Sequence, residues 1–366
     1  MITLDGSHLE GGGSIARVAL ALSTLTGKAF ELDSIRKNRP QPGLKSQHLF
    51  CVKALEKLCN AKAEGAELGS TYMKYVPGKI QGKSIEIDIQ TAGSIPLFLQ
   101  AVLLPSMFAD KPVKLNIIGG TDGKWAAPMD YFMHVFLPQM RRFAGIECKL
   151  LKRGYYPKGN GKVEIKIKPK FNLYGYPNLN DFLRDVGEKV ERVSLIEQNH
   201  LMHIKGISHA SVDLQNAKVA ERQASSAEFL LKKYNVPIKI SLEYDKTLST
   251  GSGITLWAVF SRRTDDLDIS NPIIIGADCL GERGKKAEEV GTEAASRLAK
   301  EIDSKAPVDR HLADQLLPYM ALLPGSKIKV SEITSHTRTN LYVITQFLGV
   351  KFDIDEKEKV VSVLGN

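Results

Sequence analysis

Polar and hydrophobic residues alternate with a period of two in three segments that lie far apart along the chain. Each segment follows a stretch of helical periodicity, and alternation after a turn predicts a half-buried strand. A second stretch of helical periodicity comes after each predicted strand. The three predicted strands are Gly27–Leu32, Asp110–Leu115 and Gly325–Val330, and the helical stretches that follow them are 43–59, 126–144 and 336–348.

Two short strands joined by a turn follow the second helical stretch. Examples are Cys148–Leu151 with Lys162–Ile167, and Val350–Ile354 with Val360–Val363. The same order of elements therefore occurs three times, as a β-α-β-α-β-β unit. We expect the three repeated units to form one large domain.

Residues from about 188 to 306 depart from this spacing. They contain four strand patterns and two helical patterns, enough for a self-sufficient module, which we interpret as an insertion. The strands are expected at 200–206, 237–244, 254–260 and 272–277, and the helices at 214–233 and 285–302. The predicted fold class is therefore α+β. It has a large domain of three repeats over 1–187 and 307–366, and an inserted smaller α+β domain of four strands and two helices over 188–306.

Composition narrows the kind of protein. Of the 366 residues, 43% are apolar and 25% are charged, which is the balance of a globular rather than a disordered chain. Fifty Lys and Arg residues against 41 Asp and Glu residues leave a net charge of +9. This excess favours an anionic partner, with nucleic acid ahead of acidic lipid.

Cysteine usage and hydropathy predict the setting of the protein. No apolar run is long enough to span a bilayer, and the first residues lack a signal-peptide pattern. The four cysteines are scattered and form no CxxC pair, which argues against a zinc knuckle and for a reducing compartment. We therefore expect a cytoplasmic protein with no membrane partner. The sequence does not determine an oligomeric state.

A glycine triplet near the start of the chain is the first candidate for chemistry. In the segment Glu10–Arg17, three glycines open a predicted helix, so backbone N–H groups there can approach an anion. The motif is not a Walker A loop, because no Gly-Lys-Ser/Thr follows. It indicates either a phosphate or metal–phosphate site with Glu10 and Arg17 nearby, or a plain tight turn between a strand and a helix.

Three further loops combine glycine or proline with basic or aromatic residues. Arg36–His48 suits phosphate oxygens but is equally typical of a solvated basic loop. Gly119–Asp122 is either an anion-binding turn or a plain connection. Arg153–Gly161 is a glycine-rich basic hairpin with two tyrosines, able to stack on RNA or to serve as an ordinary β-turn.

Two segments near the C-terminus contain histidines. His311–Gln315 opens one helical stretch, and Ser335–Asn340 opens another. A neutral imidazole at His336, among hydroxyl groups and an arginine, is able to act as base, ligand or nucleophile. The alternative is that His336 is merely a neighbour of a helix cap.

Taken together, the motifs resemble those of the RNA 3′-terminal phosphate cyclase family. The resemblance covers nearly the whole chain and has seven pieces in the family's order. They are Asp5–Ser7 with Glu10–Gly13, Pro42–Leu44 with Gln47–His48, Thr91–Ser94 with Gln100, Gly119–Asp122, Tyr156–Pro157, Leu312–Gln315, and His336 with Thr339–Asn340.

The resemblance implies an ATP-dependent conversion of an RNA 3′-phosphate to a 2′,3′-cyclic phosphodiester, releasing AMP and pyrophosphate. A phosphate monoester is a poor electrophile, and adenylylation gives it AMP as a leaving group. The neighbouring 2′-OH then attacks within the same molecule. The implied partners are ATP and RNA with a 3′-phosphate end.

The resemblance also implies residue roles. His336 matches the family nucleophile that takes AMP from ATP, and Glu10 matches the metal carboxylate for Mg²⁺ or Mn²⁺. The other implied contacts are Arg17 and Gln47 to phosphates, Gln315 to the α-phosphate, Gln100 and Asp314 around the nucleotide, Pro128 against adenine, and Arg39 to the RNA phosphate. His311 stands where some relatives carry an aromatic residue that stacks on adenine, and an imidazole can also stack.

Three other functions compete with the cyclase. A non-catalytic relative in the same superfamily binds RNA in ribosome assembly, but the presence of His336, Glu10 and Arg17 favours the enzyme. An enolpyruvyl-transferase-like enzyme shares the repeated architecture and would not need a histidine at position 336. A lysine-adenylating ligase would need a Lys-x-Asp-Gly motif, which the chain lacks.

Overall fold

The computed structural model describes residues 1–263 and 268–364, and its strands form four sheets of four strands each. Three of these sheets share one pairing pattern, in which the first two strands are parallel and the other pairs are antiparallel. The first sheet has the order β1 (Ile2–Asp5), β2 (Phe30–Asp33), β4 (Met73–Val76), β3 (Lys62–Glu64).

The other two sheets follow the same order at later positions in the chain. The second consists of β5 (Ser84–Asp88), β6 (Val113–Gly119), β8 (Gly161–Pro169) and β7 (Ala144–Lys152). The third consists of β9 (Ser194–Leu195), β14 (Lys327–Lys329), β16 (Val360–Val363) and β15 (Phe352–Asp355). The predicted α+β fold class is confirmed, and the alternating patterns that identified β2, β6 and β14 mark the second strand of each sheet.

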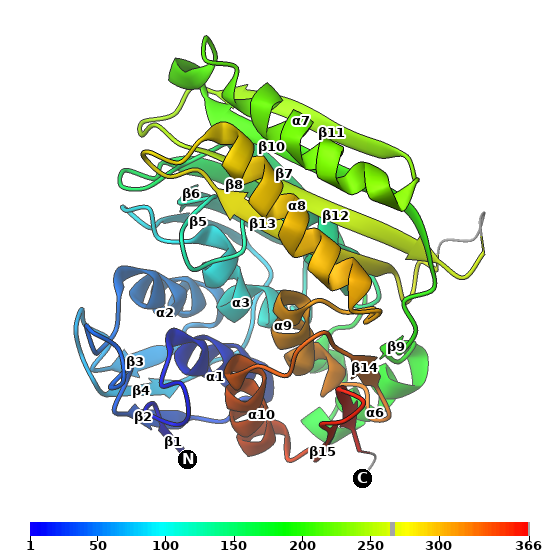
Figure 1. Ribbon diagram of the computed structural model, residues 1–366. Helices are drawn as coiled ribbons and strands as arrows, with labels where there is room; N and C mark the ends of the chain where they lie inside the picture. The colour runs from blue at the N-terminus through cyan, green and yellow to red at the C-terminus, as the bar shows by residue number, and fades with distance from the viewer. Residues whose placement is uncertain (264–267, 365–366) are drawn as a thin grey trace.

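The helices of the three units pack against one another between the sheets (Figure 1). Helix α1 (Gly13–Thr26) contacts α2 (Ser46–Cys59), α3 (Ile95–Ser106) and α10 (Ser335–Leu348), and α10 contacts α9 (Arg310–Met320). Every residue of α1 from Ser14 to Leu25 is buried, and all of them except Arg17 are apolar or small. Helix α1 is therefore at the centre of the packed helices of the three units.

The helix expected over 126–144 is interrupted. It consists of α4 (Met129–Tyr131), a π-helical turn (Phe132–Phe136) and α5 (Leu137–Met140). The Leu137 N–H bonds to the Phe132 carbonyl five residues earlier, and Pro138 supplies no N–H of its own. A proline at this point removes a regular helical bond, which accounts for the wider turn that precedes it. The short amphipathic helix α6 (Leu179–Lys189) follows β8.

Along the chain, the strands of the fourth sheet come between β9 and α9 of the third unit. The strand order of this sheet is β11 (Ile238–Asp245), β10 (His200–Ser211), β12 (Ser252–Ser261) and β13 (Ile273–Leu280). Two helices, α7 (Val219–Leu231) and α8 (Ala287–Asp303), cover one face of the sheet (Figure 1). Helix α4 contacts β12 and β13, and the π-helical turn contacts β13. Every residue of β12 is buried as a result. The domain boundaries at 187/188 and 306/307 stay a prediction. Ser194 and Leu195, which lie within the predicted insertion, pair with β14 and therefore belong to the third sheet.

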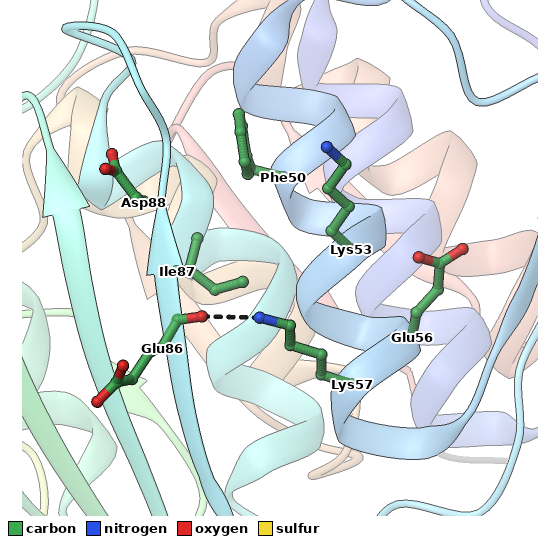
Figure 2. Close-up of a pocket in the computed structure, with 7 residues that line it drawn as sticks. All are labelled: Phe50, Lys53, Glu56, Lys57, Glu86, Ile87 and Asp88. Atoms are coloured by element: carbon green, nitrogen blue, oxygen red, sulfur yellow. Dashed lines mark hydrogen bonds between the residues drawn. The ribbon is translucent and has the colours of Figure 1, made fainter.

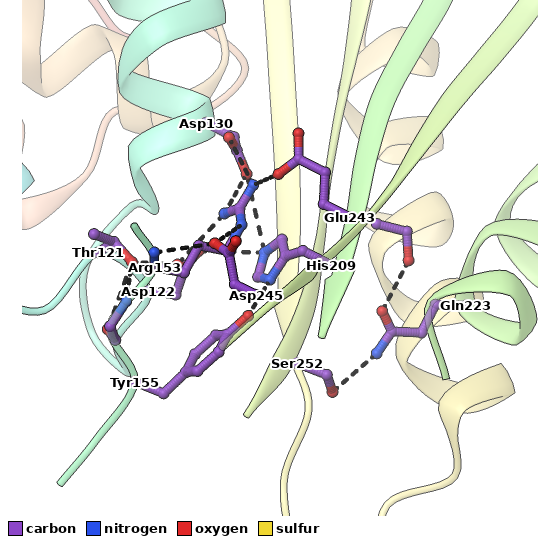
Figure 3. Close-up of polar contacts among 12 residues, drawn as sticks. Thr121, Asp122, Asp130, Arg153, Tyr155, His209, Gln223, Glu243, Asp245 and Ser252 are labelled. Carbon is purple, nitrogen blue, oxygen red and sulfur yellow. Dashed lines mark hydrogen bonds and ion pairs between the residues drawn. The ribbon is translucent and has the colours of Figure 1, made fainter. Parts of the chain in front are cut away.

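A buried charge network connects the second unit to the fourth sheet (Figure 3). The Arg153 guanidinium, which has no exposed surface, lies 2.9 Å from Asp130 and 2.6 Å from Glu243 of β11. His209 of β10 lies 3.3 Å from Asp122. Burial opposes ionisation of Asp122, but His209 and Arg153 outweigh it and hold the pKa of Asp122 below its ordinary value. The charges therefore stabilise each other across the junction.

Replacing Arg153 with methionine should lower the free energy of unfolding by about 3–5 kcal/mol, because it leaves carboxylates buried without a partner. Urea unfolding followed by circular dichroism measures the change. Arg222→Met is the control, because Arg222 forms an ion pair with Glu288 on the exposed surface and should matter far less. Equal losses in the two variants would contradict a special role for the buried network.

Candidate functional site

One cavity lies where helices of all three units meet. Residues of α1, α3, α9 and α10 line it, together with the loop before α4. Its apolar wall includes Val18, Leu104, Phe132, Phe136 and Tyr319. The polar side chains that line it are Ser14, Arg17, Gln100, His311, Asp314, Gln315, His336 and Asn340. The structure therefore brings together six of the residues that the sequence predicted for the site.

The N-terminus of α1 is shaped to accept an anion. Gly12 precedes the helix in extended conformation, and no side chain caps the first turn. The first N–H groups of the helix are consequently available, at its positive end. A Cβ added at Gly13 would lie 2.4 Å from His48 Nε2 and 2.9 Å from an Arg17 guanidinium nitrogen. Glycine is therefore required for two donor side chains to lie against this turn.

Arg17 provides a fixed positive charge beside the turn. Its side chain is buried, and its Nε donates to Gln100 Oε1 of α3 at 2.9 Å. Burial lowers the pKa of Arg17 to about 10, which still leaves the guanidinium charged at neutral pH. The hydrogen bond to Gln100 uses one donor, so the terminal nitrogens remain for an anionic ligand.

His48 and Ser14 add two buried polar atoms that have no protein partner. His48 Nδ1 accepts the Lys45 backbone N–H at 2.9 Å, so the proton of the neutral ring sits on Nε2. Burial, with a further contribution from Arg17, lowers the pKa of His48 to about 3 and keeps the ring neutral. Ser14 lies in the glycine-triplet segment and His48 in the Gln47–His48 motif, but the sequence analysis predicts no function for either residue. Their common position at the α1 turn indicates that they belong to the anion site.

Glu10 and His336 form the central contact of the site. Glu10 Oε2 lies 2.7 Å from His336 Nδ1, and the other carboxylate oxygen pairs with Arg39. Burial lowers the pKa of His336, and Arg17 and Arg39 lower it further. A neutral ring that donates its Nδ1 proton to Glu10 has a free lone pair on Nε2. Glu10 Oε2 accepts no hydrogen bond of regular geometry from the described residues, so its pairing with His336 is a close charge contact, and Nε2 is free to act as a nucleophile when the ring proton sits on Nδ1.

Asp314 holds the first turn of the helix that carries His336. Its carboxylate accepts hydrogen bonds from the hydroxyls of Thr337 at 2.7 Å and Thr334 at 3.2 Å. Its backbone carbonyl accepts from the Asn340 amide at 3.0 Å. Burial raises the pKa of Asp314 to about 6. Asp314 lines the cavity and positions the start of α10, and its contact with a nucleotide stays a prediction.

The remaining predicted residues lie in different places. Gln315 lines the cavity and donates to the His311 carbonyl, and Arg39 is partly exposed and paired with Glu10. Gln47 lies in the first turn of α2 near Gly93, outside the cavity lining. Pro128 is buried at the start of α4, and the neighbours that line the cavity instead are Trp125, Ala126 and Ala127. The ligand contacts predicted for these residues stay predictions.

Two other places in the described residues were candidates for binding. The carboxylates of Asp122 and Asp130 and the imidazole of His209 have ligand atoms within 4.8 Å of one another, but Arg153 already pairs with both carboxylates. The pocket between α2 and β5 is lined by Phe50, Lys53, Glu56, Lys57, Glu86, Ile87 and Asp88 (Figure 2). Lys57 there donates to the Glu86 carbonyl, and none of the predicted site residues takes part.

The length and hydropathy of the helices bear on whether the chain crosses a membrane. Within 1–263 and 268–364, no helix combines the length and the apolar character needed to cross a bilayer.

Comparison with known proteins gives one consistent result. The family model described as RNA 3′-terminal phosphate cyclase matches residues 8–354. A relative with that name from Pyrococcus furiosus is 45% identical over 97% of this chain and 95% of the relative. Another, from Archaeoglobus fulgidus, is 44% identical over 96% of this chain and 98% of the relative. A third, from Methanosarcina acetivorans, is 43% identical over 99% of both chains. With a match over nearly its whole length, this chain belongs to the RNA 3′-terminal phosphate cyclase family.

Proposed function

We propose that this protein uses ATP to convert an RNA 3′-phosphate into a 2′,3′-cyclic phosphodiester, through a covalent His336–AMP intermediate. The observation that carries the proposal is the Glu10–His336 contact beside the uncapped N-terminus of α1. A neutral nucleophile and an anion site next to each other are what nucleotidyl transfer from a triphosphate requires. The family membership of the chain supports the same reaction.

In the first step, His336 Nε2 attacks the α-phosphorus of ATP. The N–P bond forms, the bond from the α-phosphorus to the bridging oxygen breaks, and pyrophosphate leaves. The Nδ1 proton stays with the ring, and the Glu10 carboxylate, 2.7 Å from Nδ1, stabilises the positive charge that the ring acquires. Arg17 and the N–H groups at the start of α1 bind the phosphates and the charge that develops on them.

The RNA end reacts in two further steps. An oxygen of the RNA 3′-phosphate attacks the phosphorus of the His336 adduct, the N–P bond breaks, and the RNA-adenylate forms. The 2′-OH of the terminal ribose then attacks the RNA phosphorus, AMP leaves, and the hydroxyl proton passes to solvent. Both reacting groups of this last step lie on one ribose, so the attack has the advantage of proximity.

A divalent cation is compatible with the donors at the site. The Glu10 side chain, which carries the carboxylate, is 18% exposed. Mg²⁺ commonly binds one or two carboxylates together with substrate phosphates. Mg²⁺ or Mn²⁺ would neutralise charge on the triphosphate. Because Glu10 already contacts His336 and Arg39, its carboxylate has two functions to serve, namely to orient the nucleophile and to bind the ion.

His336→Ala should abolish covalent labelling by ATP that is radioactive at the α-phosphate, because no other nitrogen is held in the same position. His200→Ala, an exposed histidine at the start of β10, is the control and should label like the unmodified protein. Equal labelling of the His336 variant would exclude this residue as the nucleophile. A complete lack of labelling in the unmodified protein would favour the non-catalytic RNA-binding relative.

Two variants of Glu10 separate its two functions. Glu10→Gln keeps an acceptor for the His336 Nδ1 proton and loses the negative charge, whereas Glu10→Ala loses both. If Glu10 binds the ion, both variants should slow adenylylation at least about tenfold in Mg²⁺, with partial recovery in excess Mn²⁺. Initial rates of labelling measure this effect. A Glu10→Gln variant with the rate and metal dependence of the unmodified protein would mean that Glu10 only orients His336.

A further inference from the structure

Trp125 stands out among the residues that line the site cavity. Its side chain is 88% exposed, although a large aromatic side chain normally gains free energy from burial. Its backbone has φ = 73°, a left-handed conformation that is unfavourable for a bulky residue. A conformation of this kind persists where the surroundings hold it, and such positions cluster at functional sites.

The residues on either side of Trp125 have different surroundings. Lys124 Nζ lies 5.5 Å from the centre of the Trp125 ring and 3.1 Å from Glu282, which follows β13 in the fourth sheet. After Trp125, Ala126 and Ala127 line the cavity and Pro128 is buried. The indole therefore sits at the rim of the cavity, with Lys124 near one face of the ring and most of its surface exposed.

We propose that Trp125 is a stacking platform for the 3′-terminal base of the RNA, an inference that rests on the proposed function. Every base has a π-face that can stack on an aromatic side chain without sequence preference. An indole that is 88% exposed suits a base that arrives at the rim and stays partly in solvent. The adenine of ATP would have to enter the cavity itself, where buried apolar side chains such as Phe132 and Phe136 provide a surface for it.

The neighbourhood of the loop also suits a polynucleotide. Glu282, which ties down Lys124, is followed directly by Arg283, an exposed residue. A basic side chain close to a stacking surface can contact the phosphate that joins the terminal nucleotide to the next one. The Lys124–Glu282 ion pair therefore brings the loop after β13 of the fourth sheet next to the loop that carries the indole.

Kinetics of two variants test the proposal. Trp125→Ala should lower kcat/KM for RNA by about 5- to 140-fold, the range that matches ~1–3 kcal/mol per stacked base. Trp125→Phe should recover most of the loss. The rate of His336 labelling by ATP without RNA should stay unchanged in both variants. Phe229→Ala, an exposed aromatic residue on α7, is the matched control and should not affect either reaction.

An RNA with an abasic 3′-terminal nucleotide identifies the base that stacks. It should react poorly with the unmodified protein and no worse with Trp125→Ala, because the stacking partner is already absent. A variant that loses ATP labelling would assign the platform to adenine and overturn the proposal. Equal sensitivity of both proteins to the abasic end would overturn it as well.

Binding measured without chemistry distinguishes failure of this proposal from failure of the proposed function. The chain has two tryptophans, and Trp257 is buried and stacked on His134. RNA with a 3′-phosphate should therefore quench the fluorescence of the exposed Trp125, and the quenching should vanish in Trp125→Phe. Quenching without any His336 labelling would uphold the platform and reject the reaction, whereas labelling without quenching would reject the platform.

Discussion

The complete burial of α1 is the constraint on which the rest of the structure depends. Apart from Arg17, the buried residues of this helix are apolar or small on all sides, so the helix must be surrounded, and α2, α3 and α10 pack around it. The N-terminus of α1 then points its uncapped N–H groups into the space between three units. Arg17, one turn further along, remains inside the protein and is held by Gln100. The anion site is thus a product of how the core is packed.

The three units contribute different groups to this one site. The first supplies Glu10 and Arg17, the second supplies Gln100 and the loop with Trp125, and the third supplies Asp314 and His336. No unit contains the site alone, so their packing is a condition for chemistry. The fourth sheet is attached through the buried Arg153 network. The exposed Lys124–Glu282 pair joins the loop after β13 to the loop at the cavity rim.

Local patterns in the sequence were sufficient for much of the fold. Alternation predicted β2, β6 and β14, and the glycine triplet predicted the turn before α1. The π-helical turn was not predicted, since it depends on how one proline perturbs a helix that is otherwise regular. The partners of Arg153 come from positions up to 92 residues away, and the Glu10–His336 contact joins opposite ends of the chain. Such contacts are determined by packing, which periodicity does not reveal.

In the proposed reaction, Glu10 lies against Nδ1 of His336 and Nε2 is the nucleophile. Nuclear magnetic resonance of the adenylylated protein, with ¹⁵N in its histidines, tests this most directly through coupling between phosphorus and nitrogen. The account predicts one coupled nitrogen, Nε2 of His336, with a proton retained on Nδ1. A bond from phosphorus to Nδ1, or to any other residue, would contradict it.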